Sequence, residues 1–486
     1  MSKDLFKGND GGSDGFFKTF KTHFTQQDLN DMAAYSYFVK MNATRPPKKY
    51  FKPDGICIGE LSDGTLLYLP LDQIERHMSV SGKTRSGKTT LLMRIFLHLF
   101  ALANCVLVVM DKGDLVSQIL DRVDTRLDEI IYVRCSDTDY PASINLLQLA
   151  NFRPEIVIGE IVRILNCTAT DRLSDRMVML LRRSILALLC LPNSTLADVE
   201  KLLFDEIFRN RVLSKVSDPD LVYFFRRYSR KEKLFTSSAE GIVTRLEPFV
   251  ADPVARHLLC QEKTNIPFLE LAKGRRKLAL LIDLNTDGIT PMVADLISRV
   301  FLVIIYGLCL SRPFQDATPT YLILDECQTY CQPAILSEVL SRGAKWHTHM
   351  ICSFQYLDQL QSLWPAVEGN AGSLISFTSG AGDAARLSKS FPGTNASEFV
   401  NLPRFKTLIR LNDQDGTFAF KAGTLPLPYA GRSYRDQIVE LSRQKYAKPR
   451  AEVEAEFQKR RELIVNQNSV KDESARPFVE NFEPLI

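Results

Sequence analysis

The fold of this chain is decided by the stretch Met78-Ser-Val-Ser-Gly82-Lys-Thr-Arg-Ser-Gly87-Lys88-Thr89. A short β-type run leads there into a glycine loop of the pattern GxxxxGK[ST], and an apolar helical pattern follows from Thr89 to about Leu102. The next apolar run, Cys105-Val-Leu-Val-Val-Met, predicts a buried strand of a parallel sheet. The order strand, loop, helix, strand is typical of a nucleotide-binding βαβ unit.

The glycine loop predicts a phosphate-binding site for ATP. Glycine lets backbone N–H groups approach the phosphates, Lys88 can reach the β- and γ-phosphate oxygens, and the Thr89 hydroxyl can bind Mg²⁺. The alternative interpretation is a glycine turn that matches the pattern by chance. Arg85 replaces a small residue common in such loops and adds a cation beside the phosphates. The predicted ATP contacts are Gly82, Lys83, Thr84, Arg85, Ser86, Gly87, Lys88, Thr89 and Thr90.

Two carboxylates end a second apolar run, Tyr321-Leu-Ile-Leu-Asp325-Glu326. This is the Walker B arrangement, in which Asp325 orients the Mg²⁺ shell and Glu326 polarises the attacking water. Gln355 follows the run Met350-Ile-Cys-Ser-Phe, where its amide could report on the γ-phosphate. The alternative for Gln355 is an ordinary polar residue after a strand.

Composition places the chain among folded soluble enzymes. Of its 486 residues, 45% are hydrophobic and 24% are charged, and the formal charge is +4, which supports nucleic-acid binding only weakly. Ten cysteines lack the spacing of a zinc site. No signal peptide opens the chain, and polar or charged residues interrupt its two most apolar stretches, so we expect a cytoplasmic protein with no integral membrane span.

The periodicity along the chain predicts an α/β fold with a mainly parallel sheet and an inserted all-α domain. Residues 155–262 have helical periodicity, and strands are expected again at Leu278–Ile282, Tyr321–Leu324, Met350–Ser353, Leu374–Phe377 and Thr407–Leu411. A short β-hairpin is expected between residues 55 and 70. The predicted division is an N-terminal extension (1–50), a first motor part (51–154), the insertion (155–262), a second motor part (263–430) and a charged helical tail (431–486).

Further motifs resemble one family. After the glycine loop come Asp111-Lys-Gly-Asp-Leu, Ile144-Asn-Leu-Leu, Asp325-Glu-Cys-Gln and Gln355-Tyr-Leu-Asp-Gln-Leu. Later segments include Gly369-Asn-Ala-Gly-Ser-Leu-Ile-Ser-Phe, Asp383-Ala-Ala-Arg-Leu-Ser-Lys, Asn401-Leu-Pro-Arg-Phe and Pro449-Arg-Ala-Glu-Val-Glu-Ala-Glu. From about residue 55 to 455 the chain resembles the coupling-protein ATPases of conjugation and type IV secretion, TraG/TraD-like members of the HerA/FtsK superfamily.

The resemblance implies a RecA-like P-loop motor that hydrolyses ATP with Mg²⁺ and works as a homo-hexameric ring around DNA, without sequence specificity. It implies a place beside a membrane transfer apparatus, with a relaxase or a channel protein at the C-terminal tail. Two departures stand out. The chain lacks the N-terminal membrane helices of many coupling proteins, and Thr378 stands where relatives often have arginine.

Ring motors need a cation that acts across the subunit boundary. The candidates are Arg342, Lys345 and Arg386, each with a plain surface charge as the alternative. The densest basic run, Arg226-Arg-Tyr-Ser-Arg-Lys-Glu-Lys, is a candidate DNA contact or a solvated helix face. Two other functions stay open, an ATPase that feeds proteins to a secretion channel and an ATP-gated assembly or adaptor protein with little motor activity.

Overall fold

The structure, a computed structural model, describes residues 46–472 apart from 103, 151–153, 168–171, 230–231, 274–276, 286, 311–317, 331–332 and 428–430. The predicted N-terminal extension up to residue 45 and the end of the tail beyond residue 472 therefore lie outside the described residues. The same holds for Arg230 and Lys231 of the basic run.

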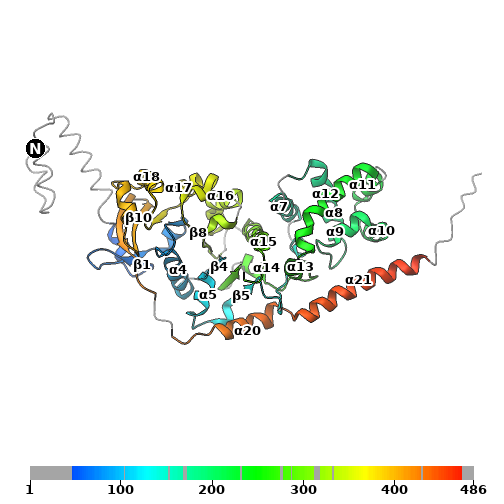
Figure 1. The fold of residues 1–486 in the computed structure, drawn as a ribbon, viewed down its shortest axis with the longest axis horizontal. Helices are drawn as coiled ribbons and strands as arrows, with labels where there is room; N and C mark the ends of the chain where they lie inside the picture. The colour runs from blue at the N-terminus through cyan, green and yellow to red at the C-terminus, as the bar shows by residue number, and fades with distance from the viewer. Residues whose placement is uncertain are drawn as a thin grey trace, which may run out of the picture.

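The described residues form an 11-stranded sheet at the centre of the motor part, in the order β2-β1-β11-β10-β9-β3-β8-β7-β4-β6-β5 (Figure 1). From β9 to β5 in this order, all neighbours pair in parallel. From β2 to β9 they pair antiparallel. The bounds are β1 Ile56–Glu60, β2 Leu66–Leu69, β3 Met78–Ser81, β4 Val106–Asp111, β5 Ile130–Arg134, β6 Leu278–Asp283, β7 Thr320–Leu324, β8 Thr348–Phe354, β9 Ser373–Ser376, β10 Lys406–Asp413 and β11 Gly416–Gly423.

Each predicted strand has a counterpart in the structure, but one runs in the opposite direction. The sequence predicts that Thr407–Leu411 joins the parallel sheet, whereas β10 pairs antiparallel with β9. The reason is that only two short helices, α18 (Ala381–Ser390) and α19 (Ala396–Val400), separate the two strands, and the chain returns at the edge where it left. Strands β5 and β11 were not predicted.

Helices cover both faces of the sheet. Along β4, the side chains of Val106, Val108 and Met110 belong to one hydrophobic core, and those of Leu107 and Val109 belong to the other. This alternation explains why β4 is apolar throughout. Helices α4 (Lys88–Leu102) and α5 (Leu115–Leu120) cover one face, while α15 (Pro291–Leu310), α16 (Pro333–Arg342) and α17 (Trp364–Asn370) cover the other.

Between β5 and β6 the described residues that form regular structure are all helical, and most of these helices make a group at one end of the molecule (Figure 1). The predicted insertion 155–262 falls inside this run, although its limits as a domain stay a prediction. None of the described helices combines the length and the apolar character that a bilayer crossing requires. The helices are α6 Leu146–Ala150, α7 Pro154–Cys167, α8 Asp175–Leu189, α9 Asp198–Phe204, α10 Glu206–Leu213, α11 Pro219–Ser229, α12 Glu232–Val250, α13 Pro253–Leu259 and α14 Phe268–Lys273.

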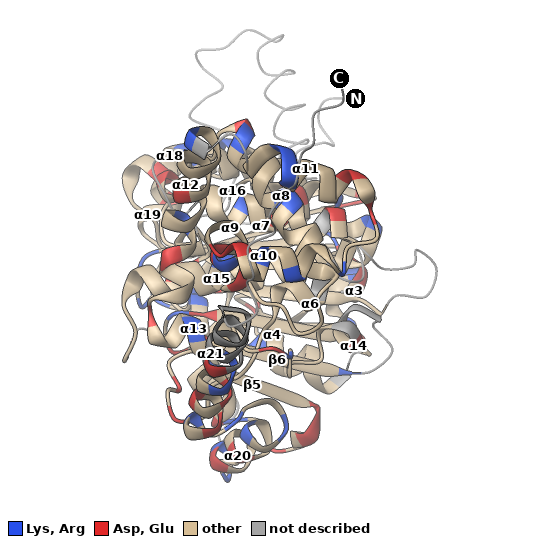
Figure 2. Ribbon diagram, turned by 90° about the vertical axis from the view of Figure 1, so that its right-hand side faces the viewer, with Lys and Arg blue, Asp and Glu red and all other residues tan. Residues whose placement is uncertain are grey.

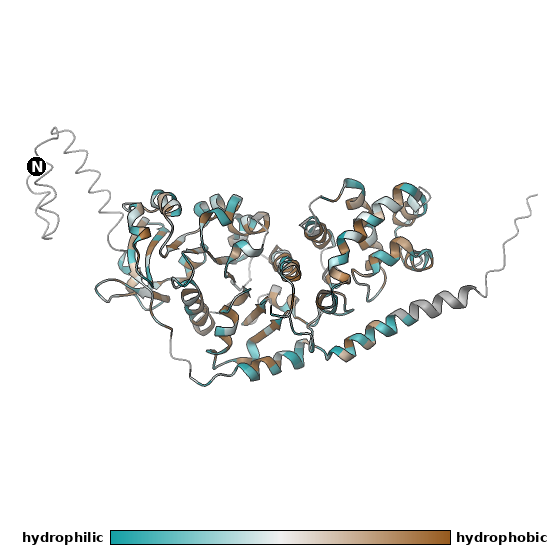
Figure 3. Ribbon diagram, in the orientation of Figure 1, coloured by the Kyte–Doolittle hydropathy of each residue, from teal (hydrophilic) through white to brown (hydrophobic). Residues whose placement is uncertain are grey.

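Two C-terminal helices, α20 (Arg435–Tyr446) and α21 (Arg450–Asp472), run from the edge of the sheet to the helical group (Figure 1). Their described residues are mostly hydrophilic, as predicted for this segment (Figure 3). Helix α20 packs on the edge strand β5, where the backbone N–H of Tyr132 donates to Ser442 Oγ at 3.0 Å. The helix therefore covers a strand edge that would otherwise be open to pairing.

Candidate nucleotide-binding site

The loop between β3 and α4 has the backbone geometry of a phosphate-binding loop. Gly82 and Gly87 have φ angles of 147° and 126°, which favour glycine. A Cβ atom on Gly82 would lie 2.6 Å from the Cβ of Phe377, so a larger residue does not fit. The loop ends where α4 begins at Lys88, and helix N-termini present unpaired N–H groups to anions.

The Lys88 side chain is held against this loop. Its ammonium group donates to the carbonyl oxygens of Gly82 at 2.7 Å and Lys83 at 3.1 Å, and the residue is buried. Burial lowers the pKa of Lys88, whereas the carboxylates of Asp325 and Glu326 raise it. The predicted phosphate-binding cation and the predicted Walker B acids are thus close enough to interact.

Thr89 and Asp325, the two predicted metal ligands, are in direct contact. Thr89 Oγ1 donates to Asp325 Oδ2 at 2.9 Å, and Ser353 Oγ donates to Asp325 Oδ1. Burial raises the pKa of Asp325, and the hydrogen bonds from Ser353 and Thr89 lower it. A hydroxyl and a carboxylate suit Mg²⁺, which prefers oxygen ligands and is commonly held by one or two carboxylates together with phosphates and water.

Glu326 and Gln355 also meet. Gln355 Nε2 donates to Glu326 Oε1 at 2.6 Å. The two residues follow neighbouring parallel strands, β7 and β8, so the carboxyl ends of the strands bring them together. Glu326 has a positive φ of 52°, and its backbone N–H donates to both Asp325 Oδ1 and Ser353 Oγ at 3.1 Å. The Asp325 side chain therefore contacts Thr89, while the adjacent Glu326 side chain contacts Gln355.

Two of the three candidate trans-acting cations, Arg342 and Lys345, lie away from this cluster. Arg342 ends α16, and Lys345 lies in the short helix η4 (Gly343–Trp346), which immediately precedes β8 and so lies at the opposite edge of the sheet. Arg386 lies on α18, where its guanidinium pairs with Asp358 at 2.6 Å. A role for any of them in a neighbouring subunit stays a prediction.

A cavity of about 420 Å³ opens over the loop. Its walls include most of the predicted loop residues and both acids, while Gly82 and Ser86 are buried in the loop itself. The sequence patterns do not single out the other wall residues as site residues. The complete lining is Thr84, Arg85, Gly87, Lys88, Thr89, Thr90, Asp111, Lys112, Gly113, Asp114, Gln118, Asp325, Glu326, Arg404 and Phe405.

Asp111 is one residue that sequence reasoning missed. It ends β4 in the same way that Asp325 follows β7, and this was the available signal. Its carboxylate accepts the backbone N–H groups of Gly113 at 2.8 Å and Val116 at 3.1 Å. Burial raises the pKa of Asp111 to about 7, and the carboxylate of Asp325 adds to this shift. Asp111 therefore adds a second buried carboxylate, beside that of Asp325, to the cavity.

Arg404 and Phe405 were also missed as site residues, although both belong to the quoted motif Asn401-Leu-Pro-Arg-Phe. They immediately precede β10. Because β10 runs antiparallel to β9, its beginning lies at the edge where β3, β7 and β8 end. Only the direction of this strand brings the motif to the cavity, so local sequence carried no signal.

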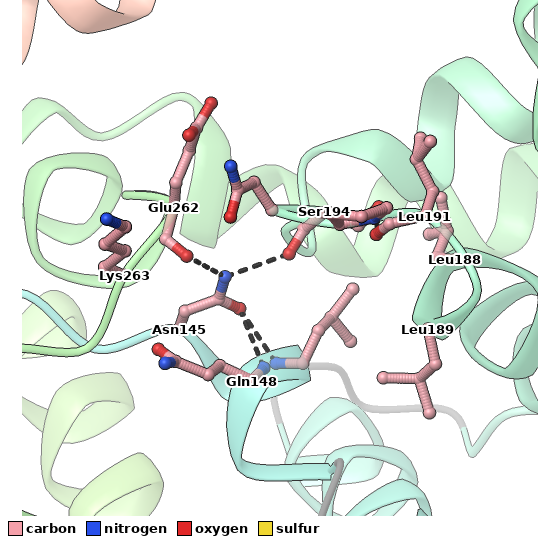
Figure 4. Close-up of a pocket in the computed structure, with 11 residues that line it drawn as sticks. Asn145, Gln148, Leu188, Leu189, Leu191, Ser194, Glu262 and Lys263 are labelled. Carbon is pink, nitrogen blue, oxygen red and sulfur yellow. Dashed lines mark hydrogen bonds between the residues drawn. The ribbon is translucent and has the colours of Figure 1, made fainter.

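A second cavity, of about 290 Å³, lies within the helical run between β5 and β6 (Figure 4). Asn145, from the quoted motif Ile144-Asn-Leu-Leu, lies at its wall. Its amide nitrogen donates to the carbonyl oxygens of Ser194 at 2.9 Å and Glu262 at 2.8 Å, and its amide oxygen accepts the N–H of Leu147 at 2.9 Å. Asn145 therefore ties three chain segments together, which is a structural role.

No family model matches the chain, and no curated protein matches it in sequence. The solved structure of the plasmid coupling protein TrwB in complex with ADP and Mg²⁺ aligns with a TM-score of 0.57 at 13% identity, covering 81% of this chain and 96% of that one. This chain shares its fold. The bacterial conjugative coupling protein TrwBdeltaN70 in an unbound form aligns with a TM-score of 0.57 at 14% identity, covering 82% and 93%.

VirB4 of Thermoanaerobacter pseudethanolicus has the same coupling-protein-like fold, with a TM-score of 0.54 at 14% identity over 80% of this chain and 99% of VirB4. At identities this low, the likeness shows the fold. The predicted α/β P-loop fold with a mainly parallel sheet is thereby confirmed.

Proposed function

We propose that this chain is an ATP-hydrolysing ring motor that moves DNA for transfer between cells, as in conjugation or type IV secretion. The observation that carries the proposal is the convergence of Lys88, the Thr89–Asp325 pair and the Glu326–Gln355 pair at one edge of the sheet. TrwB, which has this fold, was solved with ADP and Mg²⁺ and with a non-hydrolysable ATP analogue. ATP and Mg²⁺ are accordingly the proposed substrate and cofactor.

The loop and its lysine bind the phosphates in this proposal. Lys88 exchanges its contacts with the Gly82 and Lys83 carbonyl oxygens for phosphate oxygens, which form stronger charge-assisted hydrogen bonds. Thr89 and Asp325 would hold Mg²⁺, since their oxygen atoms already lie 2.9 Å apart. A bound Mg²⁺ supplies charge neutralisation on the β- and γ-phosphates.

Hydrolysis requires a water molecule aligned with the γ-phosphate and a group that accepts its proton. Glu326 takes this role because it adjoins the metal-binding Asp325 at the end of β7. Gln355 positions Glu326 through the 2.6 Å hydrogen bond between their side chains. Release of this bond when nucleotide binds would free the Glu326 oxygen for the water molecule.

DNA is the proposed cargo, and a ring is the proposed assembly. Helix α11 carries exposed Arg226 and Arg227 beside Tyr223, and this combination suits a nucleic-acid backbone and its bases. Basic segments lie on α11 and on α8 of the helical group (Figure 2). We place the protein in the cytoplasm beside a transfer apparatus, as a homo-hexamer that contacts a relaxase or channel protein through its C-terminal tail.

Two variants test the division of roles in the site. Lys88→Ala is expected to weaken Mg²⁺–ATP binding by about 100-fold, because two charge-assisted hydrogen bonds are lost. Glu326→Gln should keep ATP binding within a few fold and lower kcat by about 100-fold or more, because only proton acceptance is lost. Lys52→Ala, an exposed lysine far from the cavity, is the matched control. Binding is measured by calorimetry and turnover by phosphate release.

Equal loss of binding in both variants would contradict the assigned roles, and near-normal turnover in Lys88→Ala would reject the site. The cargo is tested separately. DNA should raise the wild-type rate, and added salt should remove this increase, because phosphate contacts are electrostatic. Stimulation by a secreted protein in place of DNA would favour the secretion ATPase, and negligible turnover with ATP-dependent assembly would favour the adaptor.

A further inference from the structure

Phe405 has an unusual position for a large apolar residue. Its side chain is 37% exposed, and its φ angle is 65°, in the left-handed region that costs a bulky residue free energy. The backbone N–H and carbonyl groups of Phe405 are both hydrogen-bonded. The N–H donates to the Ser86 carbonyl of the phosphate-binding loop at 3.1 Å, and the carbonyl oxygen accepts the N–H of Thr424 at 2.8 Å. A strained conformation kept by such contacts points to a functional role.

The Phe405 ring packs beside the phosphate-binding loop and contacts the guanidinium group of an arginine. A Cβ atom on Gly87 would lie 2.9 Å from Cδ1 of Phe405, so the ring lies directly against this glycine. The guanidinium carbon of Arg404 lies 4.5 Å from the centre of the ring, which is a cation–π contact. Arg404 is exposed, and both residues line the nucleotide cavity. One part of the cavity wall is thus a flat aromatic and cationic surface.

This surface lies on the far side of the loop from the acids. In the sheet, β3 carries the loop, and β7 with Asp325 and Glu326 lies two strands away in one direction. Strand β10, which follows Phe405, lies two strands away in the other direction. The phosphates bind at the loop, and the metal-binding acids lie on the β7 side. The nucleoside therefore extends toward the β10 side of the loop. A purine base is a flat π system that stacks on aromatic rings and on guanidinium groups.

We propose that Arg404 and Phe405 form the nucleoside-binding end of the cavity, where a purine base stacks on the Phe405 ring beside the Arg404 guanidinium. This inference rests on the proposed function, since it assigns the base of the same ATP molecule. Stacking grows with ring size, so the surface favours purine over pyrimidine nucleotides. It leaves the triphosphate to the loop and to Lys88.

The test compares ligands with and without a base. Phe405→Asn removes the ring and keeps a residue that tolerates the left-handed region, while Phe405→Trp keeps an aromatic surface. The probes are Mg²⁺ complexes of ATP, CTP and inorganic tripolyphosphate, with affinities measured by calorimetry. We expect Phe405→Asn to weaken ATP about tenfold and CTP less, with tripolyphosphate unchanged. Phe405→Trp should retain ATP affinity.

The matched control is Tyr140→Ala. Tyr140 is also an exposed aromatic residue under an arginine, with Arg443 at 4.8 Å from the ring centre, but it lies outside the cavity. Its removal should change none of the three affinities. Unchanged ATP affinity in Phe405→Asn, or equal losses for ATP and tripolyphosphate, would overturn the inference and leave the ring as a support for the loop. A wild-type chain that binds neither ATP nor tripolyphosphate would reject the proposed function itself, and this inference with it.

Discussion

His77 shows how one buried residue links the nucleotide strand to its neighbour. It precedes β3, has a φ of 64°, and its Nδ1 accepts the backbone N–H of Met350 in β8 at 2.9 Å. Burial lowers the pKa of His77 to about 4. The imidazole is therefore neutral in the folded protein at pH values where an exposed histidine is already charged.

This shift predicts loss of stability in mild acid. Because the folded pKa lies below the ordinary value of 6.5, the unfolded chain binds more protons between these pH values. The stabilisation is complete above about pH 6.5 and falls by up to about 3 kcal/mol as the pH approaches 4. His77→Asn tolerates the left-handed backbone, retains an acceptor for the Met350 N–H and removes the titration.

The measurement is the free energy of unfolding in urea across this pH range for both proteins. The comparison with the variant is needed because Asp111, whose pKa is raised to about 7, acts in the opposite sense. Its protonated form favours folding, so its contribution falls as the pH rises from about 4 to about 7. Parallel pH curves for wild type and His77→Asn would rule out the His77 contribution.

Helix α21 contacts the helical group through an ion-pair cluster. Arg460 pairs with Asp198, a fully buried carboxylate at the start of α9, and lies 3.5 Å from Glu262. Asp198 also accepts the backbone N–H of Thr195 at 2.8 Å. The aromatic ring of Phe457 stacks on His257 of α13, with 5.8 Å between the ring centres. The helix thereby fastens the helical group to the C-terminal segment that covers β5.

Arg460→Ala should destabilise this attachment. We expect a loss of about 1–3 kcal/mol in the free energy of unfolding, because the buried Asp198 loses a charged partner but keeps its other hydrogen bonds. The neighbouring exposed Lys459 provides the control, and Lys459→Ala should unfold like wild type. Equal stabilities of the two variants in urea would show that α21 does not hold the helical group.

In the proposed ring, a cation of one subunit would complete the site of its neighbour, and none of the three candidate cations lines the cavity of its own subunit. If Arg386 acts on the ATP of a neighbouring subunit, head-to-tail packing completes each site, and closure of this packing gives a ring. Activity per subunit should therefore rise with protein concentration, and DNA should increase it further by favouring the closed assembly. Turnover over a dilution series, with and without DNA, measures both effects.

Mixing subunits separates the candidates. If Arg386 is the trans-acting cation, Arg386→Ala subunits should bind ATP normally and lower the activity of mixed rings more than their share. Lys389→Ala, an exposed lysine on the same helix, should leave mixed rings unaffected. Activity strictly proportional to concentration and indifferent to DNA and to mixing would favour the adaptor.

The parts predicted correctly from sequence are those that depend on neighbouring residues. The glycine loop requires positive φ at Gly82 and Gly87, and parallel strands such as β4 and β7 require uninterrupted apolar runs. In the βαβ unit, the glycine loop and an apolar strand lie within one short segment of the sequence. Local residue patterns are therefore sufficient to place the glycine loop, the strand that leads to Asp325 and Glu326, and the helical run between β5 and β6.

The sequence alone determined an α/β fold with a glycine loop and with strands that lead to Asp325 and Glu326 and to Gln355. Tertiary structure decided the contacts that depend on strand order and direction. Only the sheet brings Thr89 against Asp325, buries Asp111 enough to move its pKa, and turns β10 so that Phe405 reaches the cavity. The physical reason is that local sequence specifies backbone conformation, whereas desolvation and proximity arise from segments hundreds of residues apart that pack in one core.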